Sequence, residues 1–315
     1  MTTELESRTS SLITLASGQG RATAIVSTRA ASLRTLTVGG TALVEPTAGT
    51  EQPSGMAGAV LVPWPNRVED AVWWYEGEQQ RLTITEPQMG NAIHGLLADT
   101  DYEIITCQDD CVQLRTILEP QPGYPFRLGV AVRYVIDDHG LQSRIEITNY
   151  AEEPAPVAVG VHPYVCIGDV PLDTLRVTLD ADWLWTLDQR YLPVMAWDVQ
   201  GTRQDPGTPH LVQAAPSHAV YHRSTPHPRG QVHRLQAPDG RTVDLWADRG
   251  LPWTQWYVAP DLLTDRGPRR ALAIEPMSAP PNALRTGLGL CFLACGMTRS
   301  WEWGLTLRQA TSRAR

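Results

Sequence analysis

The feature that most limits the fold of this chain is a series of short apolar segments separated by turn residues. Two segments, 127–136 and 141–150, flank Asp137-Asp-His-Gly140, and this arrangement predicts a β-hairpin. No window of 11 or more residues shows a 3.6-residue apolar period, so we expect few and short helices. The same strand and turn pattern recurs at 102–106 with 112–118, at 231–236 with 242–246, and at Trp301, Trp303, Leu305 and Leu307.

Short strands separated by Gly and Pro predict an all-β fold, either a large antiparallel β-sandwich or a barrel, and not an α/β fold. The 315 residues contain no internal repeat and no linker, so we expect a single domain over residues 1–315. The least regular stretch, from Gly201 to Gly230, is rich in Pro and His, and we interpret it as long surface loops.

The charge composition restricts the partners and the chemistry. The formal net charge of −8 argues against nucleic acid or an anionic membrane as a partner. All 26 basic residues are Arg, which excludes Schiff-base chemistry and a Walker-type phosphate loop, although a genomic base-composition bias would give the same absence of Lys. We expect a monomer or a homodimer.

The chain shows no signal for export or membrane insertion. Residues 1–6 are acidic and lead into no apolar core, and no run of about 18 apolar residues occurs, so we expect a cytoplasmic protein. The five cysteines are an odd number and suggest reduced thiols. Cys107 with Cys111, and Cys291 with Cys295, lack the usual zinc spacing and a nearby His, so we expect no metal and no cofactor.

Three proton-carrying side chains stand at the ends of apolar, strand-like runs: His94 before Gly95, His162 before a Pro, and Glu275. Imidazoles titrate near neutral pH, and burial tunes a carboxylate toward the same range, so these groups suit acid–base chemistry on a neutral polar substrate. Each has a plainer interpretation as a structural residue. In particular, Glu275 and Arg67 would form a buried ion pair if Glu275 were not catalytic.

Taken together and in order, five segments resemble the aldose 1-epimerase (galactose mutarotase) family. They are Pro65-Asn-Arg67, Asn91-Ala-Ile-His-Gly95, His162-Pro-Tyr164, Thr254-Gln-Trp-Tyr257, and Ile274-Glu-Pro-Met277 followed by Pro281-Asn-Ala283.

The resemblance runs from about Val62 to Leu307 and implies a β-supersandwich that binds a small sugar in a cleft. It implies that Glu275 is the general base and His162 the general acid, placed on opposite sides of the sugar. It also implies that Asn66, Arg67, His94 and Gln255 hold sugar oxygens.

The expected reaction interconverts the α and β anomers of a hexose or a related sugar. A base takes the proton of the anomeric hydroxyl, an acid protonates the ring oxygen, and the open chain rotates about C1–C2 before closing. Five tryptophans are candidates for a sugar-stacking surface, although core packing is the more common role for a Trp: Trp64, Trp73, Trp74, Trp253 and Trp256.

One position departs from the family pattern. His218, in Ser217-His-Ala-Val-Tyr221, aligns with an Asp that usually contacts sugar hydroxyls, so His218 is a candidate substrate-binding residue with a different sugar preference.

Alternatives to mutarotation are a related enzyme that tailors another hemiacetal or natural product, a non-catalytic carbohydrate-binding protein, and a hexose-6-phosphate epimerase using Arg67 and Arg285. Glycoside hydrolysis needs two spaced carboxylates, and only Glu275 has a motif context.

Overall fold

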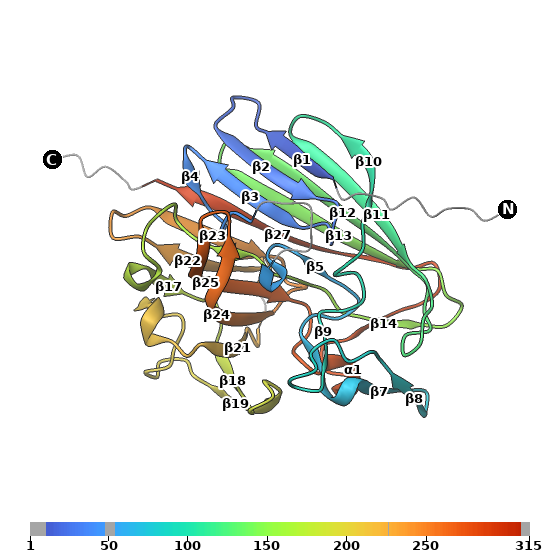
Figure 1. Cartoon of the computed structure of the whole chain (residues 1–315). Coiled ribbons are helices and arrows are strands. Elements are labelled where there is room, and N and C mark those ends of the chain that lie inside the picture. The colour runs from blue at the N-terminus through green and yellow to red at the C-terminus, as the bar shows by residue number, and fades with distance from the viewer. Residues whose placement is uncertain (1–10, 48–53, 226, 310–315) are drawn as a thin grey trace.

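The structure is a computed structural model that describes residues 11–47, 54–225 and 227–309. Its regular structure is almost entirely β, which confirms the all-β prediction (Figure 1). The helical elements of these residues are single turns: η1 (Ser54–Met56), η2 (Glu69–Ala71), η3 (Leu172–Thr174), η4 (Val212–Ala214) and α1 (Ala283–Thr286).

The largest sheet has nine antiparallel strands and contains the three predicted hairpins. Side chains alternate between core and solvent along its central strands, as the strand period of two requires. Its order is β10 (Glu103–Cys107), β11 (Cys111–Leu118), β12 (Leu128–Asp137), β13 (Gly140–Asn149), β27 (Thr298–Arg308), β23 (Thr242–Ala247), β22 (Gln231–Gln236), β17 (Arg176–Thr178) and β20 (His210–Leu211).

A second, eight-stranded antiparallel sheet supports the candidate site. Its central strands, β24 and β25, are among the longest in the molecule and cross its middle. Its order is β19 (Pro193–Asp198), β18 (Trp183–Leu187), β21 (His218–His222), β24 (Trp253–Thr264), β25 (Gly267–Met277), β15 (Gly160–Val161) and β5 (Val60–Leu61), with β16 (Tyr164–Val165) also paired to β25.

The remaining strands form smaller sheets. In Figure 1 the four-stranded sheet lies over β12 and β13, and its β2 and β3 contact these strands. Its strands are β1 (Leu12–Ala16), β2 (Ala22–Ser27), β3 (Leu33–Val38) and β4 (Thr41–Ala42). The two-stranded pairs are β6 (Arg67–Val68) with β9 (Ala92–Ile93), β7 (Val72–Tyr75) with β8 (Glu78–Arg81), and β14 (Ala155–Val157) with β26 (Cys291–Leu293).

One hydrophobic core joins these layers. It contains Trp256 and Ile274 from the eight-stranded sheet and Trp301 and Trp303 from the nine-stranded sheet, all almost fully buried. Its members extend from Ile13 to Leu307. The single-domain prediction for residues 1–315 stays a prediction, because both ends lie outside the described residues.

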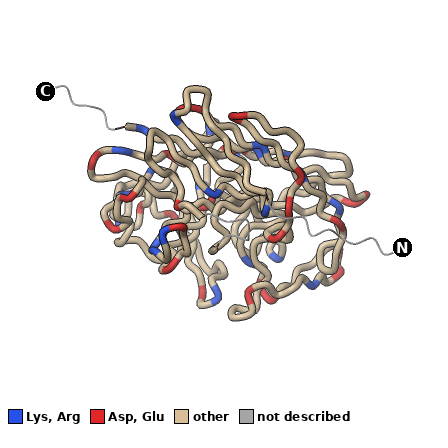
Figure 2. Tube along the Cα trace, turned by 45° about the horizontal axis from the view of Figure 1, so that its top comes forward, with Lys and Arg blue, Asp and Glu red and all other residues tan. Residues whose placement is uncertain are grey.

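The charged residues are dispersed. Figure 2 shows Arg, Asp and Glu dispersed over the described parts of the trace. Within the described parts of the chain, no helix has the length and apolar character needed to cross a membrane. The same residues contain no group of three or more His, Cys, Asp or Glu side chains arranged for a metal, and all five cysteines are free thiols.

The interpretation of 201–230 as surface loops is wrong in part. This stretch contains β20, η4 and β21, and β21 pairs with both β18 and β24 inside the eight-stranded sheet. The five-residue strand is too short to give a clear period against the surrounding Pro and Ser residues. Its assignment matters because His218 is its first residue.

A tight approach of two backbone segments positions His94. Gly95 has a φ of +77°, and a β-carbon there would lie 2.1 Å from the carbonyl oxygen of Val62. Val62 and Gly95 form a parallel β-bridge, and the Leu96 amide donates to the same Val62 oxygen. Only glycine fits this contact, which holds the His94 segment beside the Pro63–Arg67 turn.

We therefore expect Gly95→Ala to lower the free energy of unfolding by about 3 kcal/mol or more, since it adds a steric clash to an unfavourable φ. Gly20→Ala is the matched control, because Gly20 has a φ of +68° with no atom within 4 Å of the added carbon. It should lose only about 1 kcal/mol. Equal losses in denaturant titrations of the two variants would contradict the close-approach argument.

Candidate active site

The strand register places several predicted site residues on one face of the eight-stranded sheet. Gln255 on β24 pairs directly with Glu275 on β25, and Tyr257, two residues further along β24, pairs with His218 on β21. Residues two apart on a strand share a face, so these four side chains lie on the face opposite Trp256 and Ile274.

The other predicted residues reach this face from neighbouring segments. Asn66 and Arg67 come from the Pro-rich turn that leads into β6, and His94 follows β9, which pairs with β6. Asn66 and His94 both have a left-handed backbone, with φ of 58° and 63°. His162 stands between β15 and β16, both of which pair with β25.

All seven residues predicted from the sequence line one pocket of about 400 Å³, a size typical of small-molecule sites. Their roles stay predictions. Its lining consists of Gly55, Met56, Asn66, Arg67, Glu86, Ile93, His94, His162, Tyr164, Tyr191, His218, Gln255, Tyr257 and Glu275.

The central feature of the pocket is the contact between His162 and Glu275. The His162 Nε2 atom lies 3.4 Å from Glu275 Oε1, and the two side chains are only 5% and 2% exposed. The second oxygen, Oε2 of Glu275, is buried and has no hydrogen-bond partner among the described residues. The expectation that the two groups flank a sugar from opposite sides is wrong, because they lie side by side.

Burial sets the protonation of this pair. It raises the pKa of Glu275 to about 8, against a smaller opposing effect of Arg67, and lowers the pKa of His162 to about 4. The contact is therefore not an ion pair at neutral pH: one proton resides on Glu275 and the imidazole is neutral. The tuning expected for Glu275 is present, whereas the expectation that the imidazoles titrate near neutral pH is wrong.

His94 is held as a neutral hydrogen-bond donor. Its Nδ1 atom accepts a hydrogen bond of 3.3 Å from the backbone N–H of Asn66, which leaves the proton on Nε2. Burial, followed by the nearby His162 and Arg67, holds the pKa of His94 well below its usual value. The Asn66 side chain in turn donates to Gln255 Oε1 at 3.1 Å, which links the turn to the sheet.

Arg67 is paired with Glu86 and not with Glu275. Its Nε and NH2 atoms donate to the two oxygens of Glu86 at 2.8 and 2.7 Å. The interpretation of Glu275 as the partner of Arg67 is therefore wrong, because the carboxylate of Glu86 occupies the guanidinium fork. Arg285, the second cation considered for a phosphate, pairs with Glu69 and Asp70 and does not line the pocket.

His218 lies in the pocket wall, in a stack of rings. Its centroid is 4.1 Å from that of Tyr191 and 4.4 Å from that of Tyr257. Burial, followed by Arg67, lowers its pKa to about 4, so it is neutral at physiological pH.

The tryptophans considered for sugar stacking do not line this pocket. Trp64, Trp73, Trp253 and Trp256 are buried, and the exposed Trp74 lies on β7.

Two residues that line the pocket, Tyr191 and Glu86, were missed by sequence reasoning. Neither stands in a recognisable motif, and only the folded chain brings them to the other residues.

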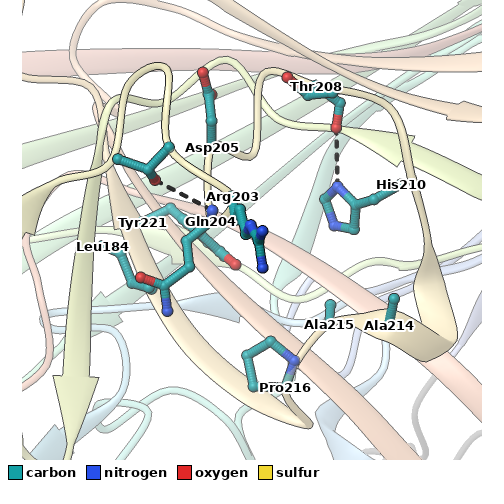
Figure 3. A pocket seen from close by; sticks show the side chains of 11 residues that line it. Leu184, Arg203, Gln204, Asp205, Thr208, His210, Ala214, Ala215, Pro216 and Tyr221 are labelled. Atoms are coloured by element: carbon teal, nitrogen blue, oxygen red, sulfur yellow. Dashed lines mark hydrogen bonds between the residues drawn. The ribbon is translucent and has the colours of Figure 1, made fainter.

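A second pocket, of about 350 Å³, lies behind β21 (Figure 3). Tyr221 lines it from the face of β21 opposite His218. Its polar groups are largely engaged locally: Asp205 accepts the N–H groups of Gly201 and Gly207, and His210 Nδ1 contacts the Thr208 carbonyl oxygen. This pocket has no buried carboxylate beside an imidazole, so the first pocket is the candidate site for acid–base chemistry.

Comparisons with known proteins agree with this fold. The family model described as Aldose 1-epimerase matches residues 11–306. The uncharacterized protein YihR of Escherichia coli (strain K12) is 32% identical over 285 residues, which cover 90% of this chain and 89% of YihR. The chain therefore belongs to the aldose 1-epimerase family.

Solved structures share the fold at lower identity. The GalM/aldose epimerase homologue from C. elegans has a TM-score of 0.83 at 18% identity, covering 96% of this chain and all (100%) of that one. A putative aldose 1-epimerase from Escherichia coli K12 has a TM-score of 0.77 at 19% identity, covering 95% of this chain and 99% of the other. The galactose mutarotase-like fold predicted from the sequence is thus confirmed.

The raised pKa of Glu275 has a consequence for stability. Because the folded-state pKa lies above the unfolded value of about 4.3, this carboxyl favours the folded state at low pH and loses that contribution as pH rises toward 8. We expect Glu275→Gln to raise the free energy of unfolding by on the order of 3 kcal/mol at pH 7, with little gain at pH 4.

Denaturant titrations across this pH range measure the effect. Glu78→Gln, at an exposed position on β8, is the matched control and should show no comparable pH-dependent gain. A Glu275→Gln variant that is less stable than the parent at pH 7 would contradict the account of a carboxyl destabilised by burial.

Proposed function

We propose that this protein is an aldose 1-epimerase that interconverts the anomers of a hexose or a related sugar. The observation that carries the proposal is the buried Glu275–His162 pair, 3.4 Å apart, in a pocket whose lining also includes several hydrogen-bonding side chains. Family membership supports the same reaction class.

The Glu275–His162 pair can accept and donate the two protons that move during ring opening. One proton must leave the anomeric hydroxyl and one must reach the ring oxygen, and both oxygens are bonded to the anomeric carbon. Two adjacent groups that share a single proton can serve both oxygens from one side. Transfer of the proton from Glu275 to His162 creates the base and the acid in the roles that the family resemblance implies. It leaves the net charge of the pair unchanged.

The ring closes by the reverse route. After rotation about C1–C2 presents the other face of the aldehyde, the hydroxyl that became protonated attacks the carbonyl carbon and returns its proton to His162. Glu275 gives its proton to the carbonyl oxygen, which leaves Glu275 as a carboxylate and His162 as an imidazolium. Transfer of the proton from His162 back to Glu275 then restores the resting state of the pair. His94 Nε2–H and Arg67 are the candidates for stabilising negative charge on oxygen during these steps.

The charges around the pocket favour a neutral substrate. Glu86 neutralises Arg67, and Glu275 carries a proton at neutral pH. A phosphate would have to displace Glu86 from the guanidinium of Arg67, and Arg285 does not line the pocket and pairs with Glu69 and Asp70. These contacts argue against a hexose-6-phosphate epimerase.

A second candidate function is the tailoring of a different hemiacetal by the same acid–base pair. The ring stack around His218 favours it, since a neutral imidazole there offers one donor and one acceptor where an Asp would accept two hydrogen bonds. The unpartnered Oε2 of Glu275 argues against a purely binding protein, because a binding site has no need of a costly buried carboxyl.

We expect Glu275→Gln and His162→Asn each to lower the turnover number for anomer exchange by about 10²-fold or more, with the fold retained. The double variant should lose far less than the product of the two factors, because the groups act as a unit. Polarimetry or NMR exchange on pure anomers measures this. Multiplicative losses would instead indicate that His162 only positions the sugar.

The His218 position should limit activity on common aldoses. We expect weak activity on glucose and galactose, and a gain of about ten- to a hundredfold on at least one of them in His218→Asp, because a charged acceptor strengthens hydrogen bonds to the sugar. The comparison uses kcat/KM from exchange kinetics. Full activity of the parent on both sugars, unchanged in His218→Asp, would count against a role for this residue in selectivity.

A further inference from the structure

The turn between β18 and β19 places a tyrosine over the site. Tyr191 lines the pocket, stacks on His218 with an interplanar angle of 22°, and receives the Arg67 guanidinium over its ring at 4.9 Å. Its ring therefore contacts both a ring on β21 and a cation from the turn that leads into β6. No family motif in the sequence includes it.

The backbone of this turn is fixed in an unusual conformation. Tyr191 has a φ of 59°, which is uncommon for a residue other than glycine, asparagine or aspartate. Asp188 maintains it: its Oδ1 atom accepts the N–H groups of Arg190 and Leu192, and its carbonyl oxygen accepts the N–H of Tyr191. A strained residue that faces a pocket indicates a functional constraint on its side chain.

Arg190 fastens the same turn to η2 and to the segment that leads into β9. Its Nε donates to the Met89 carbonyl oxygen at 2.8 Å, and its NH2 atom donates to Asn91 Oδ1 and Asp70 Oδ1, both at 2.8 Å. Figure 1 shows the β18–β19 hairpin at the same end of the molecule as β7, β8 and β9. These bonds span about a hundred residues of sequence and tie two separate segments together.

The hydrogen bonds of Arg190 connect it, through two further residues, to Arg67, which is a predicted sugar-binding residue. Asn91, which accepts from Arg190, donates through Nδ2 to Glu86 Oε2 at 3.3 Å. Glu86 holds Arg67, and the Arg67 guanidinium lies over Tyr191, the neighbour of Arg190. A displacement of Arg190 would therefore disturb both the position of Tyr191 and that of Arg67.

We propose that Tyr191 is a substrate-binding residue that forms, with His218 and Tyr257, an aromatic wall against one face of the sugar ring, and that Arg190 is the positioning residue that holds it there. This inference rests on the proposed function for the identity of the ligand. The faces of a pyranose expose C–H groups, which pack well against aromatic rings. The wall thus selects a ligand by its apolar face, while Asn66, His94 and Gln255 form hydrogen bonds with its oxygens.

Anomer exchange kinetics on an aldose panel, followed by NMR, tests the wall. Tyr191→Leu keeps apolar bulk but removes the ring, and should raise KM about tenfold with kcat changed by less than about threefold. Tyr191→Phe should return KM to within about threefold of the parent. An unchanged KM in Tyr191→Leu, or a fall confined to kcat, would overturn the binding role.

The His218 ring protons provide a readout that needs no turnover. Stacking on Tyr191 shifts these signals upfield, so both Tyr191→Leu and Arg190→Ala should move them downfield. The His218→Asp variant assigns the signals among the eight histidines. Arg203→Ala, at an exposed arginine on a neighbouring loop, is the matched control and should leave signals and kinetics unchanged. An unaltered His218 signal in Arg190→Ala would overturn its positioning role.

Titration of the same sugars into the unmodified protein separates this proposal from the proposed reaction. An apparent Kd, measured from the sugar-dependent shifts of the His218 signals, that rises about tenfold in Tyr191→Leu would support the wall even if no anomer exchange were detected. The absence of exchange would then contradict the epimerase reaction alone. Exchange without any effect of Tyr191→Leu on binding would contradict the wall alone.

Discussion

The alternation of side chains along β24 and β25 is the constraint on which the site depends. Trp256 and Ile274 must face the core that joins the two large sheets, and this requirement sends Gln255 and Glu275 to the opposite face. A slip of one residue would exchange the two faces, placing the carboxyl in the core and the tryptophan in the pocket. The free energy of core burial therefore fixes the position of Glu275.

Burial then determines what the positioned groups can do. It moves the pKa of Glu275 upward and those of His162, His94 and His218 downward, so each of these groups is neutral at physiological pH. The Arg67 guanidinium is paired with the Glu86 carboxylate at 2.7 Å. The resulting pocket contains one transferable proton within a neutral frame, an arrangement that allows proton exchange without a large change in local charge.

The site also depends on contacts between segments that are far apart in the chain. Asn66 is bonded to Gln255, Arg67 to Glu86, and Arg190 to Asn91, so the Pro-rich turn, the β18–β19 turn and the sheet stabilise one another. Gly95 permits the close approach of the His94 segment to the backbone of Val62. Such a framework keeps polar groups in defined orientations in the absence of ligand, which reduces the entropy lost on binding.

The sequence alone determined the all-β class, the three hairpins of the nine-stranded sheet and the seven predicted residues of the pocket, because strand period, turn chemistry and ordered motifs are local signals. It misassigned β21, whose five residues are too few to show a period, and it left open an ion pair between Glu275 and Arg67 that the structure does not form. Tyr191, Glu86 and the side-by-side arrangement of Glu275 and His162 were decided only by the tertiary structure. Contacts across a hundred residues, and the burial that shifts a pKa, arise when distant segments pack together and exclude water, and no local pattern encodes them.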